Sequence, residues 1–139
     1  MPRRGDLPRR PTLPAREPFA YALLRVVPRA ERGEAVNAGI VLFCRGRDFL
    51  ALRTILPAER LRALDPGADL AAISHHLATL AQIAAGDPVG GPMAAQPASA
   101  RFHWLVAPTS TVVQSSEVHT GLSSDPAATL ERLFRLLVV

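Results

Sequence analysis

The chain has 139 residues, and sixteen basic residues against twelve acidic ones give it a formal net charge of +4 at pH 7. Every basic residue is arginine, and the lack of lysine excludes P-loop, Schiff-base and pyridoxal chemistry, which all need a lysine. The single cysteine, Cys44, excludes an intramolecular disulfide and a cysteine metal cluster. The sequence shows neither a signal-peptide core nor an apolar run of membrane-spanning length, so we expect a cytoplasmic protein that has no membrane segment.

Residues 1–18 are rich in arginine and proline, and we expect them to form a disordered tail. Five arginines stand against Asp6 and Glu17 there, so this segment accounts for +3 of the net charge of +4. It has few large apolar residues, and such a segment cannot bury enough surface to offset the entropy lost on ordering. The remaining residues, 19–139, are predicted to form a single α+β domain.

Three apolar runs predict a three-stranded antiparallel meander at the start of this domain. The runs cover residues 19–27, 38–44 and 49–56, and their length and composition are typical of strands. The short polar turn 45–48 joins the last two runs, and Gly46 is expected to take a positive φ there. We expect the rest of the chain to cover one face of this sheet.

Two longer amphipathic patterns predict the helices that cover the sheet. The first runs over residues 66–85, with Asp65 and Pro66 as its start signal, after a short helical turn at 57–64. The second begins with the same Asp-Pro signal at Asp125, and its apolar residues recur at i, i+3, i+4 and i+7. Both patterns are typical of helices that pack one apolar stripe on a sheet.

The segment between these helices gives weaker signals. Residues 89–100 have no periodicity and are expected to be a loop, and residues 101–106, which carry the only tryptophan, are expected to be a short strand or extended anchor. Residues 110–116 predict a fourth strand because of their β-branched centre, and residues 117–124 are expected to be a loop. The predicted fold is therefore α+β, with a small antiparallel sheet of three to four strands covered by two main helices.

Two histidines, His103 and His119, are the candidate catalytic residues. Both lie in the irregular part of the chain beside several hydroxyl side chains, and functional residues concentrate on loops that a rigid scaffold holds. One hypothesis is an enzyme that uses them as an acid/base pair, with Arg29 or Arg32 holding an anionic substrate. The alternative for His103 is a hydrogen-bonded histidine at the edge of the core, since no nucleophile motif or paired-carboxylate spacing accompanies it.

The other two histidines do not favour a metal site. His75 and His76 are neighbours about 100° apart on the predicted helix, so they cannot share a metal as i, i+4 ligands do. We expect His75 to be solvated and His76 to lie at the boundary of the core. We predict no metal site and no cofactor.

The loop between the first two strands is a candidate binding surface. Arg29, Glu31, Arg32 and Glu34 place four charges within six residues, and Asn37 follows them. Guanidinium groups held by neighbouring carboxylates favour the binding of an anion or a partner. The alternative is a solvated turn whose charges pair with one another. Further candidate binding residues in the later polar segment are Ser110, Thr111, Gln114, His119 and Thr120.

Three blocks carry a resemblance that extends over most of residues 20–137: YALLRVVPRAERGEAVNAGIVLFC, RFHWLVAPTSTVVQSSEVHTGL and DPAATLERLF. Together these blocks resemble the bacterial domain-of-unknown-function family 3037. The resemblance implies no established activity. It does imply an accessory or partner role, through gene neighbours that resemble HipA-type serine/threonine kinases.

We therefore predict a small, non-catalytic accessory domain that binds a protein partner, for which a HipA-type kinase is the candidate. An enzyme that uses His103 and His119 is one alternative. Nucleic-acid binding through the arginine-rich tail is the other.

Overall fold

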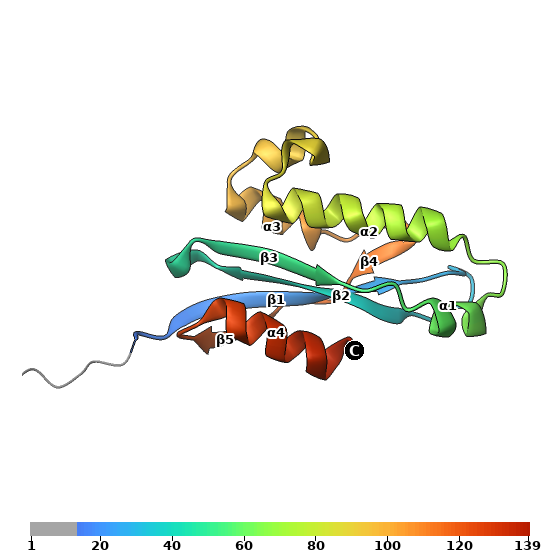
Figure 1. The fold of residues 1–139 in the computed structure, drawn as a ribbon, viewed down its shortest axis with the longest axis horizontal. Helices are drawn as coiled ribbons and strands as arrows, with labels where there is room; N and C mark the ends of the chain where they lie inside the picture. Colours follow the sequence, from blue (N-terminus) through green and yellow to red (C-terminus); the bar gives the residue numbers. More distant parts are fainter. Residues whose placement is uncertain (1–13) are drawn as a thin grey trace, which may run out of the picture.

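The computed structural model describes residues 14–139, and a five-stranded antiparallel sheet forms the centre of this range (Figure 1). The first three strands, β1 (Glu17–Val26), β2 (Val36–Cys44) and β3 (Phe49–Thr54), confirm the predicted meander. The order across the sheet is β3-β2-β1-β4, and β5 also pairs with β1. Four α-helices complete the α+β fold that the sequence predicts, although the sheet has one strand more than the largest number expected. Most of the predicted tail lies outside the described residues.

The strands β4 (Val113–Ser115) and β5 (His119–Ser123) lie end to end along one edge of β1. The predicted fourth strand over residues 110–116 is thus confirmed only in part, and the prediction of a loop over residues 117–124 is wrong. A sequence such as His-Thr-Gly has weak strand propensity, but the edge of β1 offers it hydrogen-bonding partners. The pairs that flank the break between β4 and β5 are Ser115 with Leu24 and His119 with Tyr21.

A bulge at Ser116 joins β4 to β5. The backbone N–H of Ser116 donates to the Leu23 carbonyl at 2.8 Å, and its Oγ accepts the Leu23 N–H, also at 2.8 Å. The same hydroxyl donates to the Glu117 carbonyl at 2.8 Å. A side-chain oxygen therefore replaces the backbone acceptor that Leu23 loses at the bulge.

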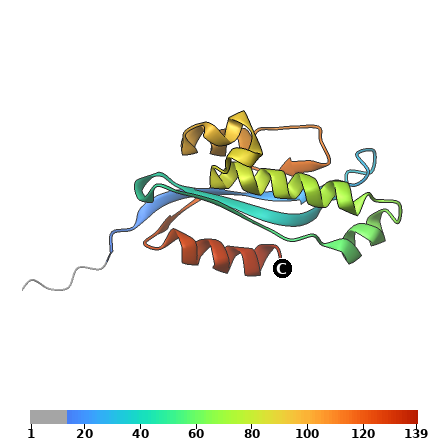
Figure 2. The same ribbon diagram turned by 45° about the horizontal axis from the view of Figure 1, so that its top comes forward.

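The two main helices cover opposite faces of the sheet (Figures 1 and 2), so the expectation of one covered face is wrong. α2 (Leu70–Ala85) packs on one face and α4 (Pro126–Leu137) on the other. Strand alternation explains this arrangement, because successive side chains point to opposite faces. The side chains toward α2 include Ala22, Leu24, Val26 and Val41, and those toward α4 include Phe19, Ile40 and Leu42. β2 is apolar at nearly every position and needs a cover on both faces.

The turn between β2 and β3 is a short 3₁₀ helix, η1 (Arg45–Arg47). The predicted turn is confirmed, but the positive φ of 49° belongs to Asp48 and not to Gly46. A Cβ at Gly46 would overlap the carboxylate of Glu17 at the start of β1, but this carboxylate ends a flexible side chain that can move aside, so the contact does not by itself require glycine.

α2 starts later than the sequence predicts. α1 (Ala58–Leu64) matches the predicted helical turn, but Asp65 does not begin the next helix. Its carboxylate accepts a backbone N–H two residues on, at 3.0 Å, and so forms a turn. Asp69 is the N-cap instead, and its carboxylate accepts the N–H three residues on, at 3.0 Å. Gly86, with φ of 72°, ends α2 as predicted.

A helix occupies the segment where a loop and a strand are predicted. α3 (Ala98–Leu105) replaces the expected strand over residues 101–106. Two 3₁₀ turns, η2 (Pro88–Gly90) and η3 (Pro92–Ala95), fill the expected loop before it. These three elements are short, and their sequence has no periodicity from which a helix could be predicted.

Tertiary contacts of Arg101 and two apolar residues explain why α3 is helical. Arg101 Nη1 donates to the last carbonyls of α2, at 2.6 Å to Ala84 and 3.2 Å to Ile83. These carbonyls have no partner inside α2, so the guanidinium stabilises the end of that helix. Phe102 and Leu105 are three residues apart, and both are buried against the sheet.

α4 begins as predicted and is fixed to the sheet by a charged contact. Asp125 caps it by accepting a backbone N–H at 3.1 Å, and Pro126 takes the first turn. Arg53 of β3 forms an ion pair with Glu131 at 2.7 Å, and its guanidinium lies 4.8 Å from the centre of the Phe134 ring. The last predicted helix is therefore confirmed.

The bulge gives a first prediction. Ser116→Ala removes the acceptor of the Leu23 N–H, and an unsatisfied buried N–H costs about 1–3 kcal/mol. We expect a lower free energy of unfolding in urea by that amount, with the circular dichroism spectrum retained. The control is Ser110→Ala, whose hydroxyl is exposed and should change stability by less than about 0.5 kcal/mol. Equal stability of the two variants would contradict the role given to Ser116.

Candidate functional site

Two adjoining cavities follow one side of α2, and we call them together the α2 groove. Their volumes are about 330 Å³ and 360 Å³, at the lower end of the range for ligand pockets. His76 contributes to the walls of both. The first cavity lies between the middle of α2, the end of α3 and β4, and the second lies between the start of α2 and the residues around Pro28 and Val112.

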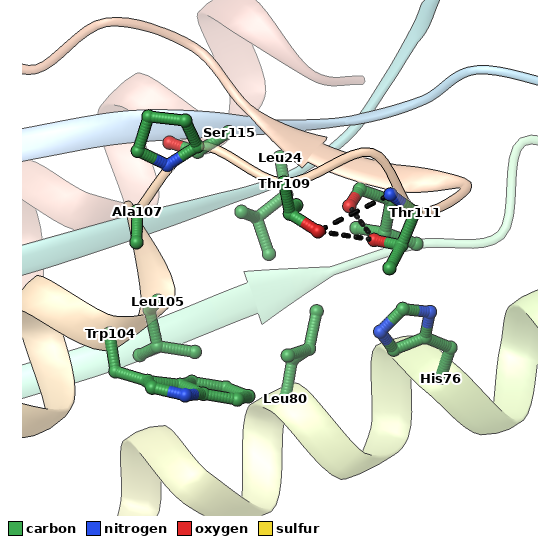
Figure 3. Close-up of a pocket in the computed structure, with 11 residues that line it drawn as sticks. Leu24, His76, Leu80, Trp104, Leu105, Ala107, Thr109, Thr111 and Ser115 are labelled. Carbon is green, nitrogen blue, oxygen red and sulfur yellow. Dashed lines mark hydrogen bonds between the residues drawn. The ribbon is translucent and has the colours of Figure 1, made fainter. Parts of the chain in front are cut away.

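The first cavity has apolar walls with a few polar groups (Figure 3). Trp104, which is 46% exposed, lies along one side beside Leu80. Thr109 Oγ1 donates to Thr111 Oγ1 at 3.3 Å, and Thr111 Oγ1 donates to the Val113 carbonyl at 2.8 Å. The hydroxyl hydrogens are thus used within the protein, and the oxygens keep lone pairs that can accept. This cavity suits an apolar group.

The second cavity has an acidic border. Asp65 and Asp69 line it together with Ile73 and Val112. Within residues 14–139, none of the arginines lines either cavity. Asp69 is eleven residues before Leu80 on α2, so the acidic and apolar ends of the groove are roughly 16 Å apart. The α2 groove therefore suits a long ligand that is apolar at one end and positively charged at the other.

Beside the second cavity lies the predicted charged loop, residues 29–34. Arg29 Nε contacts Glu31 Oε1 at 2.8 Å, and Arg32 forms an ion pair with Glu34. The four side chains are between 39% and 64% exposed, and Gly33, with φ of 69°, turns the chain back toward β2. The charges therefore pair with one another and remain in contact with solvent.

The pair of Arg29 and Glu31 stays ionised around neutral pH. A hydrogen bond from the guanidinium to Glu31 and the charge of Glu31 raise the pKa of Arg29. The pKa of Glu31 is lowered by a hydrogen bond from its own backbone N–H and then by Arg29. A lowered carboxyl pKa means that the ion pair is complete above the ordinary range of glutamate and is lost only in more acidic solution.

The structure brings the two predicted binding segments to the same end of the sheet. The Val27 N–H donates to the Val112 carbonyl at 2.7 Å, and so joins the start of the 29–34 loop to residues 110–114. Thr111 lines the first cavity, and Gln114 Nε2 donates to the Thr111 carbonyl at 3.0 Å. Ser110 is exposed beside them.

The two candidate catalytic histidines lie on opposite faces of the sheet. His103 is exposed on α3 beside Phe102, which packs on the α2 face. His119 of β5 pairs with Tyr21, whose ring lies 5.3 Å away and packs on the α4 face. The sheet therefore separates the two imidazoles, and neither lines the α2 groove. Of the candidates near His119, Thr120 is exposed on the same strand.

Asn37 takes part in holding α4. Its Nδ2 donates to the Leu137 carbonyl at 3.0 Å, and Arg60 Nη2 donates to the Val138 carbonyl at 3.2 Å. Leu137 is the last residue of α4 and Val138 is its C-cap, and carbonyls at the end of a helix have no partner inside it. Asn37 follows the charged loop closely in sequence, but its side chain contacts α4 on the other face of the sheet.

Sequence reasoning missed the most distinctive residues of the α2 groove, namely His76, Trp104 and the pair Asp65 and Asp69. His76 is half-buried and His75 is exposed, as the sequence predicts for both. The strand predicted for residues 101–106 does not indicate that Trp104 lies exposed at a cavity. In the actual helix, Phe102 and Leu105 face the core, and Trp104 is left on the outside.

Within residues 14–139, no group of three or more histidine, cysteine, aspartate or glutamate side chains could hold a metal ion. No helix in that range combines the length and the apolar character needed to cross a membrane.

The model of a family described as "Protein of unknown function (DUF3037)" matches residues 21–138. Neither a curated protein nor a solved structure matches the chain.

The contact of Asn37 gives a second prediction. Asn37→Ala removes a hydrogen bond to the end of α4, and a net loss of about 0.5–1.5 kcal/mol is expected. The free energy of unfolding in urea should fall by this amount. The matched control is Gln114→Ala, which removes an exposed amide bonded to a carbonyl of its own segment. A loss of stability for Gln114→Ala that equals the loss for Asn37→Ala would contradict this assignment.

Proposed function

The chain belongs to the DUF3037 family, whose description assigns no activity, and from the geometry of its site we propose that it is a non-catalytic domain that binds a protein partner. The binding surface in this proposal consists of the α2 groove and the 29–34 loop. The resemblance noted in the sequence makes a HipA-type kinase the first partner to test.

The observation that carries this proposal is the exposure of two large apolar side chains along the α2 groove. Trp104 is 46% exposed and Val112 is 43% exposed, one at each end of the groove. Aromatic side chains at the edge of a pocket are the usual anchors of protein interfaces, and tryptophan is prominent among them. A partner that covers both residues would remove their apolar surface from water.

The charged loop supplies a polar border for this surface. A protein interface has a desolvated centre and a solvated rim of charged groups. The ion pairs of the 29–34 loop are exposed and are not needed by the core, so the partner can meet them without disrupting the fold. Charges at such a rim determine the rate and the selectivity of association more than they determine affinity.

The geometry gives less support to the two alternatives. An acid/base pair needs both groups within hydrogen-bonding reach of one substrate, whereas the sheet lies between His103 and His119. Nucleic-acid binding through the tail concerns a segment that lies mostly outside the described residues. Within residues 14–139, the exposed arginines of the candidate loop are paired with glutamates, which reduces the positive potential that nucleic acid would meet.

Charge reversal in the loop tests the proposal. The double variant Arg29→Glu and Arg32→Glu should leave the circular dichroism spectrum unchanged and the free energy of unfolding within about 0.5–1 kcal/mol, because both side chains are exposed. It should weaken partner binding at least about tenfold, because attraction across the interface becomes repulsion. The partner is first recovered from the native host with the tagged parent chain and identified by mass spectrometry. Its affinity for each variant is then measured by isothermal titration calorimetry.

A charge-matched control separates a local effect from the change in net charge. Arg132→Glu with Arg135→Glu reverses two exposed arginines on α4, on the other face of the sheet. This control should retain parental affinity. Parental affinity in the loop variant, or an equal loss in the control, would refute the proposed surface.

A further inference from the structure

A short motif occurs twice at the start of the chain. Residues 3–8 read RRGDLP and residues 9–14 read RRPTLP, so both are copies of Arg-Arg-x-x-Leu-Pro. Each copy has two guanidinium groups and, three or four residues later, a leucine. In extended chain this spacing separates the basic and apolar groups by about 10–13 Å.

The α2 groove is complementary to this motif in both chemistry and length. Its first cavity has apolar walls formed by Leu24, Leu80 and Trp104, and its second has the carboxylates of Asp65 and Asp69. The two ends are roughly 16 Å apart along α2, a separation that extended Arg-Arg-x-x-Leu with long arginine side chains can span. An arginine-bearing segment also supplies the positive charge that the groove itself lacks.

Resting on the proposed function, in which the α2 groove is a protein-binding surface, we infer that this groove binds the Arg-Arg-x-x-Leu-Pro segment of a second copy of this chain. The leucine occupies the first cavity against Trp104, and the arginines lie at Asp65 and Asp69. Exposed ion pairs contribute little individually, so burial of the leucine provides most of the affinity and the charges select the orientation. Association of this kind is reversible and depends on protein concentration.

The length of the chain argues against binding of the Arg-Arg-x-x-Leu-Pro segment in the groove of the same chain. Arg47 Nη2 donates to the Ala15 carbonyl at 2.5 Å, which holds Ala15 at the end of the sheet where β1 begins. The second cavity lies at Pro28, and thirteen residues of mostly extended chain separate it from Ala15, roughly 43 Å. Arg4 is eleven residues before Ala15, and its backbone reaches about 38 Å at full extension, so an arginine of the same chain meets the second cavity only through its side chain and only when the whole intervening segment is stretched out. A second copy has no such limit.

The first experiment uses the full chain and a synthetic peptide of residues 1–14. Trp104 is the only tryptophan of the chain, and the peptide has no aromatic residue, so a change in tryptophan emission reports on the first cavity alone. Titrating the peptide into dilute full chain should give a saturable change in emission. A peptide with Leu7→Ala and Leu13→Ala should bind at least about tenfold more weakly, because the buried leucine is lost.

Two matched N-cap variants test the acidic end of the α2 groove. Asp69→Asn and Asp125→Asn each remove one charge from an N-cap, and asparagine retains the capping oxygen. Asp69→Asn should weaken peptide binding several-fold at low salt and less at high salt, since salt screens exposed charges. Asp125 lies at the start of α4, on the other face of the sheet from the groove. The Asp125→Asn variant should therefore bind the peptide as tightly as the parent does.

The second experiment measures the mass of the full chain by sedimentation equilibrium over a range of concentrations. The parent should associate as concentration rises, whereas the full chain with Leu7→Ala and Leu13→Ala should stay monomeric.

No emission change with the peptide, or equal effects of the two cap variants, would overturn the inference. A monomeric parent at all concentrations would overturn the second copy as occupant. No partner protein enters these measurements, so their failure would leave the proposed function standing.

Discussion

The pairing of β1 with β2 is the constraint on which the rest of the structure depends. β2 is apolar at nearly every position, so this pair must be buried on both faces. α2 covers the face of Ala22, Leu24 and Val26, and α4 covers the face of Ile40 and Leu42. The chain therefore forms three layers, with a helix on each side of one sheet (Figure 1). In this arrangement any two groups on opposite faces are separated, and for that reason His103 and His119 do not meet.

The α2 groove exists because the α2 face is covered incompletely. β4 has only three residues, and Pro108 to Val112 form no strand or helix beside α2. α3 closes the other end of this face with Phe102 and Leu105, but its remaining side chains, Trp104 among them, stay outside the core. The short edge strand and the short helix thus leave a space along α2, and half-exposed apolar residues border it.

The polar groups of the molecule divide into two classes. Ser116, Asn37 and Arg101 each satisfy backbone groups that the fold would otherwise leave without a partner. The charges of the 29–34 loop pair with one another, and they remain solvated. Groups of the first class hold the fold, and those of the second are free to meet another molecule.

The sequence by itself determined the elements whose signals are local. The meander follows from short apolar runs and a turn, α4 follows from its Asp-Pro start and apolar spacing, and the end of α2 follows from Gly86. The sequence also indicated the family, because each block that resembles it is contiguous in the chain. Tertiary structure decided what depends on distant partners. β5 forms because β1 offers an open edge, α3 forms because Phe102 and Leu105 are buried together, and Asn37 reaches α4 a hundred residues away. The α2 groove belongs to this second class, since Asp69, Trp104 and Val112 come together only when three separate segments pack around α2, and no local pattern encodes that packing.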